Sequence, residues 1–226
     1  MIKGYDIHRF FENYASKKSF STLSENKESN DPLVDNDTPA YDYEECVKRF
    51  FDSNALRMVD ATFITNDNRV YFIEFKGGFR VNIRLDNFNL EKWYCSDADK
   101  VCRQAATIFM ENQDHKIDEL ISSVNGKLVE TYITLHNFIL PLCEASDKNF
   151  HTSYIVVVDE DSHPLGAIEE TLNSLSGKGA NTINPVSNLR NAIGKYRIVN
   201  QNSEPIFFDC IEVLNTYQFN LRFPCE

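Results

Sequence analysis

Two apolar runs separated by a short polar turn constrain the fold of this chain more than any other feature. Residues 56–65 read LRMVDATFIT and residues 69–76 read RVYFIEFK, with an Asn-Asp-Asn turn between them. Turn-forming residues between two runs rich in β-branched and aromatic side chains predict a β-hairpin. If the hairpin folds about Asp67, position 60 lies opposite position 74 on the neighbouring strand, with Cβ atoms roughly 5 Å apart.

The predicted hairpin brings two carboxylates and a lysine together. Asp60 lies in the first run, and Glu74 and Lys76 lie at the end of the second. Side chains alternate between the faces of a strand, so Glu74 and Lys76 share one face. Two opposed carboxylates repel each other, and a bound divalent cation reverses the sign of that interaction. The hairpin therefore predicts a metal site with a lysine beside it; the alternative is an exposed ladder of ion pairs at a strand end.

The pair of motifs on this hairpin resembles a known nuclease pattern. Val59-Asp60 followed by Glu74-Phe75-Lys76 is similar to the core motif of the restriction-endonuclease-like, PD-(D/E)XK nuclease superfamily, with valine in place of proline. That pattern has an aspartate on one strand of a hairpin and Glu-x-Lys on the next. The resemblance implies a restriction-endonuclease-like core and a metal-dependent nuclease that hydrolyses phosphodiester bonds in DNA or RNA.

Members of this superfamily commonly add a glutamate from the helix before the hairpin, with apolar residues three, six and seven positions after it. Counted from Glu44, those positions hold Val47, Phe50 and Phe51. Helical geometry, at roughly 100° per residue, places Glu44 at the border of the apolar face and Glu45 nearly opposite to that face. Glu44 is therefore the expected third carboxylate, with Glu45 in reserve.

The resemblance also implies a role for each residue of the site. Mg²⁺ or Mn²⁺ suits phosphodiester hydrolysis and prefers oxygen ligands. Asp60 and Glu74 would supply carboxylates, and the Phe75 main-chain carbonyl would fill another position. Glu44 would help to hold a second ion or orient water. Lys76 would stabilise the transition-state phosphate or position the attacking water. Further along, Arg80 and Arg84 would contact flanking phosphates, unless they are ordinary surface arginines.

Composition and charge leave a second function open. The chain has 226 residues, of which 42% are hydrophobic, and this fits a globular protein with one α/β domain by default. A net charge of −11 argues against a broad basic surface for duplex nucleic acid. The acidity favours an alternative, a catalytically inactive nuclease-fold protein that acts as a binding or host-interaction factor. A third interpretation is an unrelated α/β protein with a coincidental Glu-x-Lys triplet.

Apolar runs and cysteines indicate the cellular setting. No apolar run reaches the ~18–20 residues needed to cross a bilayer, and the first residues lack an apolar signal core. We therefore expect no membrane partner and a cytoplasmic location. The six cysteines are widely scattered and include no Cys-x-x-Cys, which favours free thiols over disulfides or a zinc site.

The remaining chain divides by its periodicity. Residues 5–17 predict a short amphipathic helix, and the polar stretch 16–39 predicts a loop or a poorly ordered insert. We therefore separate an N-terminal segment, 1–40, from a single α/β domain, 41–226. Downstream, residues 91–124 predict one long helix or two, and prolines open the predicted helices 164–175 and 185–195.

Predicted strands complete the fold class. The run TSYIVVV at 152–158 is continuous enough for a central buried strand. Apolar and β-branched residues predict four further strands, at 129–142, 196–199, 206–214 and 217–223. Together these elements predict a mixed central β-sheet flanked by helices and wound by a right-handed crossover.

Overall fold

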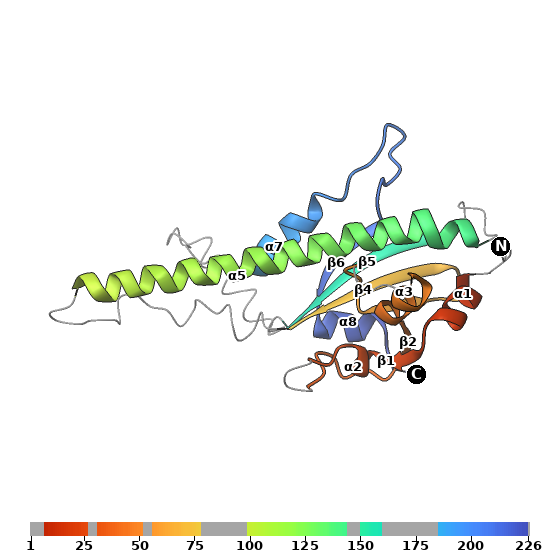
Figure 1. The fold of residues 1–226 in the computed structure, drawn as a ribbon, viewed down its shortest axis with the longest axis horizontal. Helices are drawn as coiled ribbons and strands as arrows, with labels where there is room; N and C mark the ends of the chain where they lie inside the picture. Colours follow the sequence, from red (N-terminus) through yellow and green to blue (C-terminus); the bar gives the residue numbers. More distant parts are fainter. Residues whose placement is uncertain are drawn as a thin grey trace.

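A six-stranded mixed β-sheet forms the centre of the molecule in the computed structural model, which describes residues 7–26, 31–51, 56–77, 99–143, 150–159 and 185–225 (Figure 1). The strands lie in the sheet in chain order: β1 (Lys17–Ser19), β2 (Pro39–Asp42), β3 (Ala61–Ile64), β4 (Arg69–Lys76), β5 (His151–Val158) and β6 (Cys210–Asn215). Neighbours from β1 to β4 are antiparallel, whereas β5 runs parallel to β4 and β6 parallel to β5.

Helices cover both faces of this sheet. One face packs against α1 (Ile7–Tyr14), α3 (Tyr43–Phe51), α5 (Asp99–Thr134) and α7 (Pro185–Gly194). The other face packs against α2 (Phe20–Leu23) and α8 (Thr216–Arg222). From Tyr154 to Val158 the β5 sequence is apolar because both faces of the strand are buried there, as parallel central strands require. The predicted α/β class, a mixed sheet flanked by helices, is confirmed.

The hairpin of β3 and β4 has the predicted register. Ala61 pairs with Ile73 and Ile64 with Val70, so Asp60, directly before β3, lies opposite Glu74. The turn closes because the Asn68 N–H donates to the Thr65 carbonyl at 3.1 Å. Asn68 has a φ of 62°, a left-handed conformation that asparagine tolerates better than most residues.

Helix α5 differs most from the sequence-based expectation. It is one helix of 36 residues, about 54 Å long, which runs along the sheet and extends well beyond it (Figure 1). It continues into a π-helical turn, Leu135–Ile139, and a 3-10 turn, Leu140–Leu142. The predicted strand at 129–142 is therefore wrong. Val124, Leu128 and Leu135 recur with helical spacing and are fully buried, so packing against the sheet overrides the β-propensity of this segment.

Of three further predicted elements, two are confirmed and one is wrong. The buried strand at 152–158 is β5, and the proline-initiated helix at 185–195 is α7. The predicted strand at 217–223 is wrong, because these residues form α8. Asn215 and Gln218 form a capping box at the start of α8, and Phe219 and Phe223 are buried one turn apart.

The remaining predicted segments match the described elements only in part or lie outside the described residues. The N-terminal helix, Ile7–Tyr14, ends earlier than expected, and part of the predicted loop at 16–39 is instead β1 and α2. The segment 196–199 contributes only an isolated bridge between Val199 and Pro205, and of 206–214 only the last part belongs to β6. The predicted helix at 164–175 lies outside the described residues.

Candidate functional site

Asp60 and Glu74 point to the face of the sheet that α5 covers. Along β4, Val70 and Phe72 belong to the core under α1, α3, α5 and α7, whereas Ile73 belongs to the opposite core. Alternation therefore directs Glu74 to the α5 side, and the contacts of both carboxylates agree with this. The two side chains lie on one face at the end of the hairpin, as the sequence predicts.

A lysine from α5 lies between the two carboxylates. The Lys127 ammonium donates to Glu74 Oε2 at 2.7 Å and to Asp60 Oδ1 at 3.3 Å. The second oxygen of each carboxylate has a different neighbour. Asp60 Oδ2 accepts from the Phe75 N–H at 2.8 Å, and Glu74 Oε1 lies 2.9 Å from the Lys76 ammonium. The described site thus holds two carboxylates and two ammonium groups, with no formal net charge.

Packing of α5 fixes the position of Lys127. Val124 and Leu128, on either side of it in the helix, are fully buried against the sheet. The Tyr154 hydroxyl, on β5, donates to the Val124 carbonyl at 3.2 Å and ties the helix to the strand next to β4. The segment before β3 also contacts α5, since the Arg57 N–H donates to the Glu130 carboxylate. Lys127 is therefore held over the hairpin end, and its side chain is only 18% exposed.

Burial makes the charge of Glu74 costly. The Glu74 side chain is 0% exposed, and burial together with the nearby Asp60 charge raises its pKa from 4.5 to about 7. Lys127 and Lys76 oppose that change without cancelling it. Burial lowers the pKa of Lys127, but the Asp60 and Glu74 charges outweigh burial, so its pKa lies above the usual value. Lys127 therefore carries its charge at neutral pH, whereas Glu74 keeps its proton to a higher pH than a free glutamate.

The glutamates of α3 lie at its first turn. The Tyr43 N–H, at the start of α3, donates to the Asp60 carbonyl at 3.3 Å, so this helix begins beside the site. The partly exposed Glu44 side chain pairs with the Lys48 ammonium at 2.5 Å. Glu45 instead accepts from the Ser16 backbone N–H at 3.3 Å and from its hydroxyl. Among the described residues, no three His, Cys, Asp or Glu side chains form a group that could hold a metal ion.

The donor set nevertheless suits a hard cation. Every candidate ligand on the hairpin is an oxygen, which Mg²⁺ and Mn²⁺ prefer. Glu74 Oε1 is buried and accepts no hydrogen bond, because the Lys76 ammonium approaches it only as an ion-pair partner. In a β-strand, the N–H and the carbonyl of one residue point to the same edge of the strand. The Phe75 N–H donates to Asp60, so the Phe75 carbonyl points to the same edge of β4. Asp60, Glu74 and the Phe75 carbonyl therefore fit such an ion.

Lys127 is the site residue that the sequence pattern did not single out. The expected helix ended near Val124 and the next expected strand began at 129, so Lys127 fell into a connection. A helical signal does extend through it, because Leu120, Val124, Leu128 and Leu135 recur at spacings of four and seven. On that pattern Lys127 lies at the edge of the buried stripe, an unusual place for a lysine.

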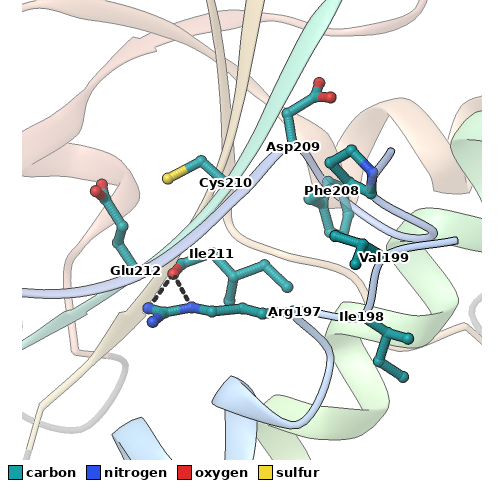
Figure 2. A pocket seen from close by; sticks show the side chains of 9 residues that line it. Arg197, Ile198, Val199, Phe208, Asp209, Cys210, Ile211 and Glu212 are labelled. Atoms are coloured by element: carbon teal, nitrogen blue, oxygen red, sulfur yellow. Dashed lines mark hydrogen bonds between the residues drawn. The ribbon is translucent and has the colours of Figure 1, made fainter. Parts of the chain in front are cut away.

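The two predicted arginines and a hollow along β6 are not part of the described site. Arg80 and Arg84 fall outside the described residues. A hollow of about 310 Å³ lies along β6, on the far side of β5 from the hairpin, and contains none of the predicted site residues. Within it, the Arg197 guanidinium donates to the Ile211 carbonyl (Figure 2). That guanidinium therefore satisfies a backbone carbonyl on the outer edge of β6.

The chain matches no protein-family model, and no curated protein or solved structure shows significant similarity to it. Within the part of the chain that the structure describes, no helix combines the length and apolar character needed to span a membrane.

Proposed function

We propose that this protein is a metal-dependent nuclease of the PD-(D/E)XK type, which hydrolyses phosphodiester bonds in DNA or RNA with Mg²⁺ or Mn²⁺. One observation carries the proposal: Asp60 and Glu74 lie opposite each other on one face, with the Lys76 ammonium beside Glu74 and a cationic group already held between the carboxylates. Opposed carboxylates on a buried face need a positive partner, and this geometry would accept a divalent ion.

Each residue of the site would have its own role in the reaction. Asp60, Glu74 and the Phe75 carbonyl would hold the ion, which supplies Lewis-acid polarisation of the phosphate and an activated water. The Lys76 side chain is 23% exposed, so its ammonium can reach a phosphate at the surface while it stays beside Glu74. There it would stabilise the charge that develops on the phosphate oxygens. Glu44, at the first turn of α3, would contribute by orienting water or a second ion.

The arrangement of elements supports the same proposal. Helix α3 precedes the hairpin, β4 carries Glu-x-Lys at its end, and α5 and the parallel strand β5 follow. We infer a restriction-endonuclease-like core for this part of the chain, with the site at the end of β4. Strand ends of a sheet with parallel neighbours are common positions for ligand sites.

A cleavage assay tests the proposal. Purified protein with Mg²⁺ or Mn²⁺ is incubated with single- and double-stranded DNA and RNA, with EDTA as a parallel condition. We expect metal-dependent cleavage that Asp60→Asn abolishes and that Lys76→Ala reduces by on the order of 10²–10³-fold.

Two substitutions serve as controls for this assay. Asp67→Asn removes a carboxylate at the opposite end of the same hairpin, and Lys195→Ala removes an exposed ammonium. Both should cleave like the unchanged protein. Cleavage by Asp60→Asn or Lys76→Ala at the unchanged rate would trace the activity to a contaminant or another site.

The lysine between the carboxylates also favours a second candidate. If Lys127 neutralises Asp60 and Glu74 permanently, the network is structural, and the protein is an inactive member of this fold that acts through binding. The net charge of −11 agrees with that function, since it does not favour contact with a polyanion. Inactivity on all four substrates at saturating Mn²⁺ would select this alternative.

A further inference from the structure

The cation position between Asp60 and Glu74 is filled by part of the chain itself. The Lys127 ammonium contacts the two carboxylate oxygens that face each other, Asp60 Oδ1 and Glu74 Oε2, while the other oxygen of each group faces Phe75 or Lys76. A metal ion held between the two carboxylates through this pair of oxygens would take the place of the ammonium. Mg²⁺ lies only about 2.1 Å from its oxygen ligands, so both cations cannot use them together.

The net charge of the cluster also indicates that the metal ion and the Lys127 ammonium do not bind together. With both carboxylates ionised, the two carboxylates and two ammonium groups of the described site balance, so a divalent ion added without any other change leaves the cluster with two excess positive charges. Glu74 is buried and Lys127 is largely so, which means that water screens this excess poorly. Movement of one ammonium out of the cluster removes half of the excess.

Lys127 is better suited than Lys76 to leave. The backbone of α5 is fixed at this point by the buried residues Val124 and Leu128, whereas a lysine side chain has a flexible four-carbon stem. Its side chain is 18% exposed, so an outward path to solvent exists. The Lys76 ammonium, by contrast, contacts Glu74 Oε1, which lies away from the shared pair of oxygens.

We infer that Lys127 is an internal counter-cation that competes with the divalent ion for Asp60 and Glu74, and that the metal binds by displacing the Lys127 ammonium. This inference rests on the proposed metal site. It makes Lys127 a residue that sets metal affinity rather than a ligand. The displaced ammonium stays tethered to α5 beside the site, where an anionic phosphate could pair with it.

Metal titration of three proteins tests the competition. Mn²⁺ binding is measured by calorimetry for the unchanged protein, for Lys127→Met, which keeps the stem and removes the charge, and for Lys127→Arg, which keeps the charge. We expect Lys127→Met to bind Mn²⁺ on the order of 10–100-fold more tightly, the size of effect typical of groups next to a metal site. Lys127→Arg should stay within a few-fold of the unchanged protein. Equal or weaker binding by Lys127→Met would overturn the inference.

A measurement on the unchanged protein covers the case in which Lys127→Met fails to fold. Lysine acetylation by acetic anhydride is followed by mass spectrometry, with EDTA and with saturating Mn²⁺. Acetylation of Lys127 should accelerate several-fold when Mn²⁺ is present, while that of the exposed Lys195, distant from the hairpin in the sequence, should not change. An unchanged rate at Lys127 with Mn²⁺ bound would show that the ammonium stays in place, and the inference would be wrong.

The outcomes separate the inference from the proposed function. If the unchanged protein binds Mn²⁺ through Asp60, as shown by loss of binding in Asp60→Asn, but Lys127→Met binds no better, the metal site stands and the competition fails. If only Lys127→Met binds Mn²⁺, the competition stands and the unchanged protein is held in the metal-free form. If a folded Lys127→Met and the unchanged protein both bind no Mn²⁺, both proposals fail.

Discussion

Replacement of Glu74 by glutamine should change how the stability of the metal-free protein depends on pH. Glutamine has the shape of the neutral carboxyl but cannot ionise. The Glu74 pKa is raised from 4.5 to about 7 by burial and by the Asp60 charge, so the folded protein holds this proton to a higher pH than the unfolded chain. Between these two values the folded state binds more protons, and its stability therefore falls as the pH rises.

The size of the effect follows from the same two values. A tenfold change in proton affinity corresponds to about 1.4 kcal/mol, so a pKa raised from 4.5 to about 7 corresponds to roughly 3 kcal/mol. Glu74 is completely buried, and solvent screening does not reduce this figure as it would for a surface group. Glu74→Gln should thus match the unchanged protein near pH 4.5 and exceed its stability by roughly 3 kcal/mol at pH 8.

Urea unfolding at pH values from 4.5 to 8.5, in EDTA, measures the difference between the two proteins. Glu119→Gln serves as a matched control, because Glu119 is exposed on α5, and its difference from the unchanged protein should stay constant over this range. A constant difference for Glu74→Gln would show that Glu74 keeps one charge state throughout. A difference that moves in favour of the unchanged protein as the pH rises would show that the ion pairs with Lys127 and Lys76 outweigh burial.

Two backbone predictions follow from the elements that position the site. Gly126 lies inside α5, where glycine is less favourable than alanine, and a Cβ there would meet the Arg57 side chain at an ordinary van der Waals distance of 3.7 Å. Gly126→Ala should therefore raise the free energy of unfolding, measured in urea, by up to about 1 kcal/mol. The control Gly194→Ala, at the end of α7, should gain less, and a loss of stability in Gly126→Ala would contradict the packing at Arg57. Asn68 has a φ of 62°, so Asn68→Ala should cost about 1 kcal/mol in thermal unfolding and Asn68→Gly should not; equal melting temperatures for the two variants would exclude the left-handed turn.

The hairpin could be predicted because its determinants are local. Turn residues at 66–68 fix where the chain reverses, and the alternation of β4 fixes which side chains share a face. These two facts are enough to place Asp60 opposite Glu74. The buried run that forms β5 and the proline that opens α7 are likewise local signals, and both elements were predicted.

The Lys127 contact could not be predicted in the same way, because it depends on tertiary packing. The segment after Val124 begins with Asn125 and Gly126, which are poor helix formers, and continues with β-branched and aromatic residues. Burial of Leu128 and Leu135 on the sheet stabilises the helix despite these preferences. The short β1 was missed for a different reason: it is polar, and its pairing with β2 along the sheet edge leaves no apolar pattern in the sequence.

The order of strands in the sheet has a consequence for folding during synthesis. Strands β1 to β4 pair with close neighbours in the chain and can assemble once about a third of the protein has been made, whereas β5 begins only at His151. At roughly 5–20 residues per second, β4 waits on the order of ten seconds for its parallel partner. During that interval it is an open edge whose residues from Val70 to Phe75 are apolar except for Glu74. An inward-facing charge on an edge strand opposes pairing with other chains. We therefore expect Glu74 to protect the nascent sheet from aggregation before Lys127 and β5 have been made.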